Sequence, residues 1–250
     1  MCEFANFSIG SSMIYKKQQI ISSNYLTPDV KLSELATFQI VENAITECMS
    51  AQHIDGKTIK AKYNAFWVFT KNKVQILDRA NWLDVVTVEC FISSKSAAKL
   101  CIDTAIKNAY GVIIAYSRCE MCPLDGATGQ ILRVSAVGVG DDIVVEPAQM
   151  AVTFDKIDAT DLPAVDEVTV RSTNIDMSRH ANNVEYLRFI LNTYTVAELA
   201  HTISAIEVNY VNQSYEGDVL AIRKLASDAS DVLAITKSDS IIVKCKIVRK

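Results

Sequence analysis

The stretch from 171 to 186, RSTNIDMSRHANNVEY, gathers side chains that could do chemistry together. A carboxylate (Asp176), a hydroxyl (Ser178) and an imidazole (His180) alternate along it, so an extended loop would point all three the same way. A carboxylate close to a histidine can fix its tautomer and raise its basicity, which makes that histidine a candidate general base. These groups indicate a hydrolytic site that acts on an acyl group.

Two neighbouring amides, Asn182 and Asn183, follow the histidine and precede an apolar periodic run, so either could cap a helix that begins there. The first turn of a helix carries unpaired N–H groups and the positive end of the helix dipole. Placed directly after His180, these groups would polarise a carbonyl and stabilise an oxyanion. A polar loop that merely caps a helix is the alternative, and the residue types alone leave both interpretations open.

A second polar segment, VNYVNQSYEGD, covers residues 208–218. Read as a strand, it places Asn209, Val211 and Gln213 on one face and Ser214 on the other. On residue types alone, the favoured interpretation is a partly exposed strand with one face in contact with solvent.

Two amphipathic helices must position these groups. Apolar residues recur at spacings of three and four over 31–52, with Ser33 as the expected N-cap, and again over 183–194. A short helical segment is expected over 196–201. Most of the remaining chain is typical of strands, expected over 13–22, 63–69, 84–93, 99–106, 111–118, 167–171 and four C-terminal segments.

The order of these elements repeats, since a strand, a helix and several strands occur twice. Such runs of strands favour an α+β fold with antiparallel sheets, each wrapping one long helix, which is a tandem (double) hotdog. We expect an N-terminal hotdog domain over 1–140, a linker region over 141–164 and a C-terminal hotdog domain over 165–250.

The chain has 250 residues, half of them apolar, and a net charge of −4, so disorder is not expected. No apolar run is long enough to span a membrane, and residues 1–13 lack the basic start of a secretory signal. We therefore expect a cytoplasmic protein. No run of Lys or Arg stands out, which disfavours nucleic-acid binding.

The seven cysteines are an odd number and lie mostly in apolar segments, which favours buried thiols over disulfides. Cys119 and Cys122 form a single CxxC, and no second pair of ligands stands at a zinc spacing. We expect neither a metal nor a cofactor.

DMSRHANNVEYLRF, residues 176–189, resembles the histidine motif of the acyl-(acyl carrier protein) thioesterase family, D-[LMV]-N-x-H-x-N-N-x-x-Y, in its bacterial and plant forms. VNYVNQSYEGDVL is similar to the downstream strand of that family. Further stretches are similar to its first helix, its tryptophan-led strands and the strand before its linker: KLSELATFQIVENA, AFWVFTKNKVQILDRANWLDVVTVECF and PLDGATGQILRV. The likeness is colinear over most of the chain.

The resemblance implies a tandem hotdog enzyme that hydrolyses the thioester between a fatty acyl chain and acyl carrier protein. In that family the C-terminal hotdog supplies the catalytic groups, and Asp176 and His180 match its aspartate and histidine. The acyl chain is expected in a tunnel of the N-terminal hotdog, where Trp67 is a candidate lining residue; plain core is the alternative for this tryptophan.

Three positions depart from the family pattern. Its asparagine is Ser178 here, its downstream glutamate is Gln213, and the cysteine of plant members is Ser214, so a cysteine nucleophile is not available there. A glutamine can orient water but cannot take its proton. We therefore expect His180 to act as the base, with Asp176 holding it.

The other polar groups then have supporting roles. Gln213 and Ser178 would position the water and the carbonyl oxygen, and the helix start near Asn182 and Asn183 would stabilise the oxyanion. Because the polar positions have changed, a non-hydrolytic acyl-binding protein is an alternative. A thioesterase acting on acyl-coenzyme A is another.

Acyl carrier protein is expected to be acidic, so an acidic chain that binds it needs a local basic patch. The candidate residues are Lys16, Lys17, Arg171, Arg179, Arg188, Arg223 and Lys224. A solvated surface charge is the alternative for each of them. Either a monomer or a homodimer is compatible with a tandem hotdog.

Overall fold

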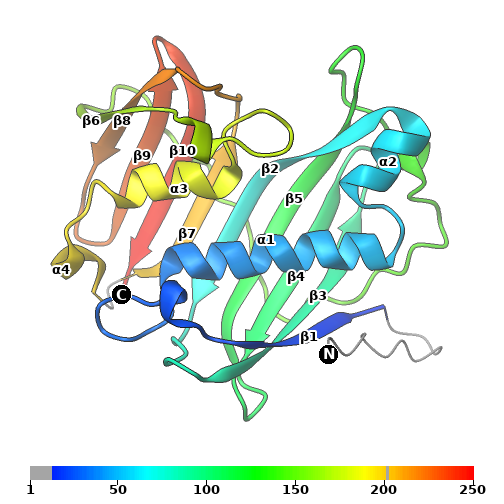
Figure 1. Cartoon of the computed structure of the whole chain (residues 1–250), viewed down its shortest axis with the longest axis horizontal. Helices are drawn as coiled ribbons and strands as arrows, with labels where there is room; N and C mark the ends of the chain where they lie inside the picture. The colour runs from blue at the N-terminus through cyan, green and yellow to red at the C-terminus, as the bar shows by residue number, and fades with distance from the viewer. Residues whose placement is uncertain (1–12, 201–202) are drawn as a thin grey trace. The chain divides into compact units, whose positions relative to one another are not determined.

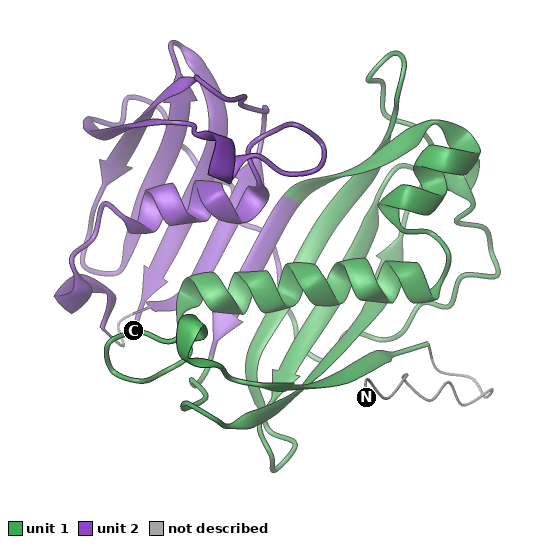
Figure 2. Cartoon of the chain, in the orientation of Figure 1, with its two compact units in different colours: residues 1–70, 77–152 green, residues 71–76, 153–250 purple. Residues whose placement is uncertain are grey.

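The computed structural model describes residues 13–200 and 203–250 (Figure 1). Residues 1–12 lie outside the described residues, so the expected absence of a secretory signal over 1–13 falls almost entirely there. Position 201, the last of the short helix expected over 196–201, also lies outside them. The chain divides into two compact units, one of residues 1–70 and 77–152 and the other of residues 71–76 and 153–250 (Figure 2).

Unit 1 contains one long helix lying against an antiparallel sheet (Figure 1). Its strands follow the order β1-β3-β4-β5-β2. Their bounds are β1 (Tyr15–Ile20), β2 (Ala65–Ile76), β3 (Val85–Lys95), β4 (Leu100–Lys107) and β5 (Ile113–Asp125). The helical elements are η1 (Ser23–Tyr25), α1 (Glu34–Ala51), α2 (Gly56–Tyr63) and η2 (Val134–Val137).

Helix α1 forms where the apolar spacing predicts it. The Ser33 side chain accepts a hydrogen bond from the N–H of Ala36, as expected of an N-cap. Its apolar positions, Ile40, Val41 and Ile45 among them, are buried against β1, β3 and β4. Burial of each such side chain contributes about 1.5–3 kcal/mol, so the core rather than helix propensity holds α1 in place.

Unit 2 repeats this plan with a shorter helix. Its strands follow the order β2-β7-β10-β9-β8-β6, and β2 enters through residues 71–76. The bounds are β6 (Ala164–Thr169), β7 (Ile203–Tyr210), β8 (Val219–Leu225), β9 (Ser230–Lys237) and β10 (Ser240–Arg249). The helical elements are η3 (Ser172–Asn174), α3 (Asn183–Leu191) and α4 (Val196–Leu199).

The expected α+β fold of antiparallel strands around one helix in each half is confirmed. Two local expectations were wrong. The second helix ends at Leu191 rather than near 194, and α2 stands where strand was expected to begin at Tyr63. Helix α2 is short and mostly polar, so it lacks an apolar period, but Asp55 caps it by accepting from the N–H of Thr58.

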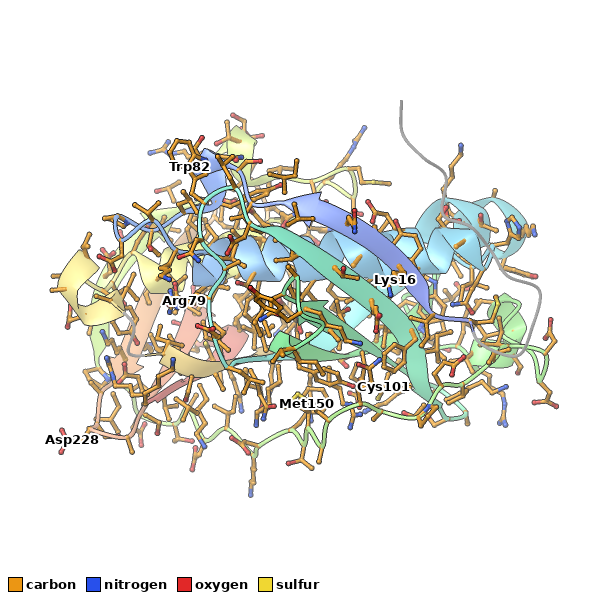
Figure 3. The ribbon with its side chains drawn as sticks, turned by 90° about the horizontal axis from the view of Figure 1, so that it is seen from below. Lys16, Arg79, Trp82, Cys101, Met150 and Asp228 are labelled. Carbon is orange, nitrogen blue, oxygen red and sulfur yellow. The ribbon has the colours of Figure 1, made fainter. Side chains whose placement is uncertain are left out.

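Residues 138–163, between η2 and β6, form neither helix nor strand. In unit 1, Met150 packs near Tyr116 on the side of the strands away from α1 (Figure 3). The carbonyl of Val152 accepts from Arg118, which also pairs with the fully buried Asp103. Polar contacts therefore hold the part of this connection that ends at Val152 against the sheet of unit 1. Among the described residues, no helix combines the length and apolar character needed to cross a bilayer.

Candidate active site

The segment with the predicted base is a tight turn at the entrance to α3. Ile175 bridges to Ala181, and within that bridge the N–H of Asp176 donates to the carbonyl of His180 at 2.9 Å. The N–H of Arg179 donates back to the carbonyl of Asp176 at 3.0 Å, and Arg179 has a φ of +65°. The expected extended loop was therefore wrong, because backbone hydrogen bonds close residues 176–180 into a turn.

The Asp176 carboxylate serves this turn directly. Its Oδ1 accepts the backbone N–H of Ser178 at 2.7 Å, an Asx-type bond that stabilises the turn. The side chain of Ser178 is exposed. The half-buried imidazole of His180 meets the ring of Tyr215 edge to face, with centroids 5.1 Å apart and an interplanar angle of 64°. This ring contact restricts the orientation of the imidazole.

Helix α3 begins directly after the turn, as the two amides predict. Asn182 is the N-cap, and its side chain accepts the N–H of Val184 at 2.9 Å. The N–H of Asn182 donates to the carbonyl of Asn174 at 2.8 Å, and the Asn174 amide donates to Glu185. Asn183 is the first helical residue, so its N–H has no partner of its own within the helix. That N–H and the helix dipole supply a positive end three positions after His180 in the chain.

A buried hydroxyl pair ties the turn, the helix and the segment after β7 together. The carbonyl of Ser214 accepts the N–H of Ala181 at 2.9 Å. The N–H of Ser214 donates to the hydroxyl of Tyr186 at 2.9 Å, and the two hydroxyls share a further bond of 2.9 Å. Both side chains are buried, and burial raises the pKa of the Tyr186 phenol. This pair sets the position of the residues on either side of Ser214.

Gln213 lies immediately before Ser214 and is exposed. The expectation that Asn209, Val211 and Gln213 share one face of a strand was wrong, because β7 ends at Tyr210. The N–H groups of Val211 and Asn212 both donate to the carbonyl of Ile242, so the strand pairing breaks there.

Beyond Ser214 the chain turns tightly into β8. The N–H of Tyr215 donates to the Asp218 carboxylate at 2.9 Å, and Gly217 adopts a φ of +87°. Burial raises the pKa of Asp218, but the Lys237 ammonium at 2.7 Å and the N–H of Tyr215 together outweigh this effect and hold the pKa below its usual value. The ion pair therefore supports the turn that presents Tyr215 to His180.

Trp67 lies in β2 within unit 1 and is half-buried. Its indole N–H donates to the carbonyl of Ile54 at 2.8 Å, and its ring packs against the unit 1 core. These contacts give Trp67 a structural role, and its role in substrate binding stays a prediction.

Unit 2 thus brings together most of the residues predicted from the sequence. One turn carries Asp176, Ser178 and His180, helix α3 starts at the two amides, and Gln213 precedes the residue that bonds the turn. Sequence reasoning missed Tyr186 and Tyr215. The first was visible as the tyrosine of the N-N-x-x-Y pattern, whereas Tyr215 carried no signal because its partner lies 35 positions earlier in the chain.

These features define a class of protein with two hotdog units and a polar turn at the helix start of the second. Residues 157–247, within unit 2, match the family model described as the acyl-ACP thioesterase C-terminal domain. The resemblance of this chain to the acyl-ACP thioesterase family is thereby confirmed.

Curated relatives carry related names. The palmitoyl-acyl carrier protein thioesterase of Gossypium hirsutum is 25% identical over 209 residues, which are 78% of this chain and 50% of the relative. Oleoyl-acyl carrier protein thioesterase 2 of Arabidopsis thaliana is 21% identical over 228 residues, 82% of this chain and 61% of the relative. Both are described as chloroplastic. The chain therefore spans half to about three fifths of the length of these relatives.

Solved structures show the same fold. An acyl-ACP thioesterase from Bacteroides thetaiotaomicron has a TM-score of 0.88 at 17% identity, covering 95% of this chain and 98% of the other. The 12:0-ACP thioesterase from Umbellularia californica has a TM-score of 0.82 at 17% identity, covering 98% and 99%. The tandem hotdog architecture is thus shared over nearly the whole chain.

Proposed function

We propose that this protein hydrolyses the thioester that joins a fatty acyl chain to acyl carrier protein, releasing a free fatty acid and the carrier thiol. The observation that carries the proposal is the position of His180 on a fixed turn at the start of α3. This turn lies within the residues that match the thioesterase C-terminal domain. The names of the curated relatives and of both solved structures support the same substrate class.

The reaction needs a base, a water and a place for negative charge. The imidazole of His180 takes a proton from water while the water oxygen attacks the thioester carbonyl. The oxyanion that forms is stabilised by the N–H of Asn183 and the dipole of α3, next to the N-cap residue Asn182. The C–S bond then breaks, and the imidazolium returns its proton to the thiolate. General-base help of this kind is worth on the order of 10²–10⁴ in rate.

The remaining predicted residues support this step. Asp176 fixes the turn that carries His180, because its carboxylate accepts the backbone N–H of Ser178. The exposed amide of Gln213 and the hydroxyl of Ser178 orient the attacking water and the carbonyl oxygen. Tyr215 holds the imidazole ring. We place the acyl chain in unit 1, with Trp67 as a lining residue.

A second candidate function is acyl binding without hydrolysis, which is favoured by Ser178 and Gln213 standing where the family has asparagine and glutamate. The two are separated by measuring thiol release from a fatty acyl-carrier thioester, alongside acyl binding by fluorescence. We expect catalytic thiol release. Saturable binding with no release above the uncatalysed rate would assign the protein as a binder.

Coenzyme A is the alternative carrier. We expect the acyl-carrier thioester to be hydrolysed with a higher kcat/KM than the coenzyme A thioester of the same acyl chain. The reverse order would identify an acyl-coenzyme A thioesterase. Cytoplasmic location and a monomeric or homodimeric state stay predictions.

A further inference from the structure

We infer that the outer face of the His180 turn is the docking surface for an acidic carrier protein, with Arg171 and Arg179 as its charged residues and Met177 as its apolar one. This inference rests on the proposed function and names where the partner binds. All three side chains are exposed, and Met177 is 93% exposed. We call these three residues the docking turn.

The contacts of the other candidate cations favour this surface. Arg188 pairs with Glu185 at 3.0 Å, and Arg223 donates to the carbonyl of Leu162. The other three also have partners: Lys16 with Glu89, Lys17 with Glu47, and Lys224 over the ring of Tyr194. Within residues 13–200 and 203–250, the structure shows no carboxylate paired with Arg171 or Arg179. Their charges are therefore available to a partner.

Unit 1 contains a second copy of the same turn, which shows that the fold does not need these side chains. The N–H of Thr27 donates to the carbonyl of Lys31 at 2.8 Å, and the N–H of Val30 donates to the carbonyl of Thr27 at 2.9 Å. These bonds match those of Asp176, Arg179 and His180. The positions of Arg171, Met177 and Arg179 correspond to uncharged residues of the first copy, namely Ser22, Pro28 and Val30.

Arg179 also occupies a strained backbone position. A positive φ is unfavourable for side chains other than Gly, Asn and Asp, and Arg179 has a φ of +65°. Val30, at the corresponding position of unit 1, has a φ of +62°, so this strain belongs to the turn itself and an arginine is not needed to form it.

The chemistry of the docking turn selects the partner. Arginines on the rim of an interface attract an acidic surface and raise the association rate. Met177, exposed in the same turn as Arg179, can adapt to an apolar side chain on that surface. Arg179 directly precedes His180 in the chain, so a carrier docked here brings its thioester arm to the proposed base.

The test uses the full chain with Arg171→Glu and Arg179→Glu, singly and together, against two substrates with the same acyl chain. One is the acyl-carrier thioester and the other is an acyl-pantetheine thioester, which has no protein surface. At low salt we expect the KM for the acyl-carrier to rise about fivefold to tenfold per substitution with kcat unchanged, and the difference to shrink at high salt. Hydrolysis of the acyl-pantetheine should stay at the wild-type rate.

Two controls make the result specific. Arg133→Glu reverses an exposed cation of unit 1 and should leave both KM values unchanged. Arg179→Lys keeps the charge and should restore most of the wild-type KM. An unchanged KM for the acyl-carrier in both glutamate variants would overturn the inference, as would an equal loss on acyl-pantetheine.

Failure of the proposed function gives a different result. If the wild-type protein hydrolyses neither substrate, the proposed hydrolysis is refuted, and docking is judged by the Kd for the acyl-carrier. A Kd about tenfold weaker in Arg179→Glu would support the docking turn, and an unchanged Kd would refute it.

Discussion

The two units contain the same backbone framework around their helix starts, but only one of them leaves its polar groups accessible. In unit 1 the N–H of Ser33 donates to the carbonyl of Tyr25 and the N–H of Leu32 donates to that of Ala80. In unit 2 the matching bonds run from Asn182 to Asn174 and from Ala181 to Ser214. The turn before β3 likewise matches the turn before β8, and each is closed by an aspartate that accepts a backbone N–H, Asp84 and Asp218.

The side chains on this shared framework differ, and they determine whether the start of the helix is covered or accessible. At the positions of Asn183 and Gln213, unit 1 has Glu34 and Arg79, which form a buried ion pair. At the position of His180 it has Lys31, whose ammonium donates to Asn81. Figure 3 shows Arg79 close to the unit 1 helix and Trp82 at the surface. A buried ion pair thus covers the start of α1 in unit 1, whereas neutral amides leave the start of α3 accessible in unit 2.

The largest stability effect is expected from breaking the unit 1 ion pair. Glu34→Gln leaves the buried Arg79 guanidinium without its countercharge, so the free energy of unfolding should fall by about 3–5 kcal/mol. The double variant Glu34→Asn, Arg79→Gln installs the amides of unit 2 and should recover most of that loss. Chemical denaturation measures both. If the free energy of unfolding falls by less than about 1 kcal/mol in Glu34→Gln, the ion pair is not what holds the start of α1 in unit 1.

Tyr186→Phe should have the next largest effect. It removes the hydroxyl that bonds the backbone N–H and Oγ of Ser214, and leaving such buried groups unpaired costs about 1–3 kcal/mol. Because this bond positions Gln213 and Tyr215, we expect kcat for thioester hydrolysis to fall more than KM changes. In unit 1, Thr37 holds the position of Tyr186, so Thr37→Val is the matched control and should leave kcat unchanged. An equal loss of kcat in Tyr186→Phe and Thr37→Val would contradict the positioning role of Tyr186.

The smallest effects concern the turn residues Leu83 and Gly217, which occupy corresponding positions. Gly217 has a φ of +87°, and a Cβ added there would meet nothing within 4 Å. Gly217→Ala should therefore cost about 1 kcal/mol from backbone strain alone. Leu83 has a φ of +65° and is 63% exposed, so Leu83→Gly should stabilise by up to about 1 kcal/mol. Thermal unfolding checks both signs, and a stabilising Gly217→Ala would contradict the correspondence of the two turns.

Much of the framework could be predicted from the sequence because it depends on local rules. The caps Ser33 and Asn182, the period of α1 and the order of strands and helices all follow from residue types at short range. Helix α2 was missed because it has one buried residue, Ile59, and no apolar face.

The repeat of the two units could not be found in the same way. Its signature is a set of backbone hydrogen bonds, and corresponding positions carry unlike side chains, such as Thr27 and Asp176 or Lys31 and His180. The candidate site was predictable where the motif is contiguous. The ion pair of Glu34 with Arg79 and the contact of His180 with Tyr215 join distant segments, so only the folded chain shows them.

We propose that the turn of unit 2, and not its copy in unit 1, carries the base. The most direct measurement compares thiol release from a fatty acyl-carrier thioester by His180→Ala and by Lys31→Ala, the corresponding substitution in unit 1, with equal melting temperatures as the folding check. We expect kcat to fall on the order of 10²–10⁴-fold in His180→Ala and to stay at the wild-type value in Lys31→Ala. Full turnover by His180→Ala would contradict the account.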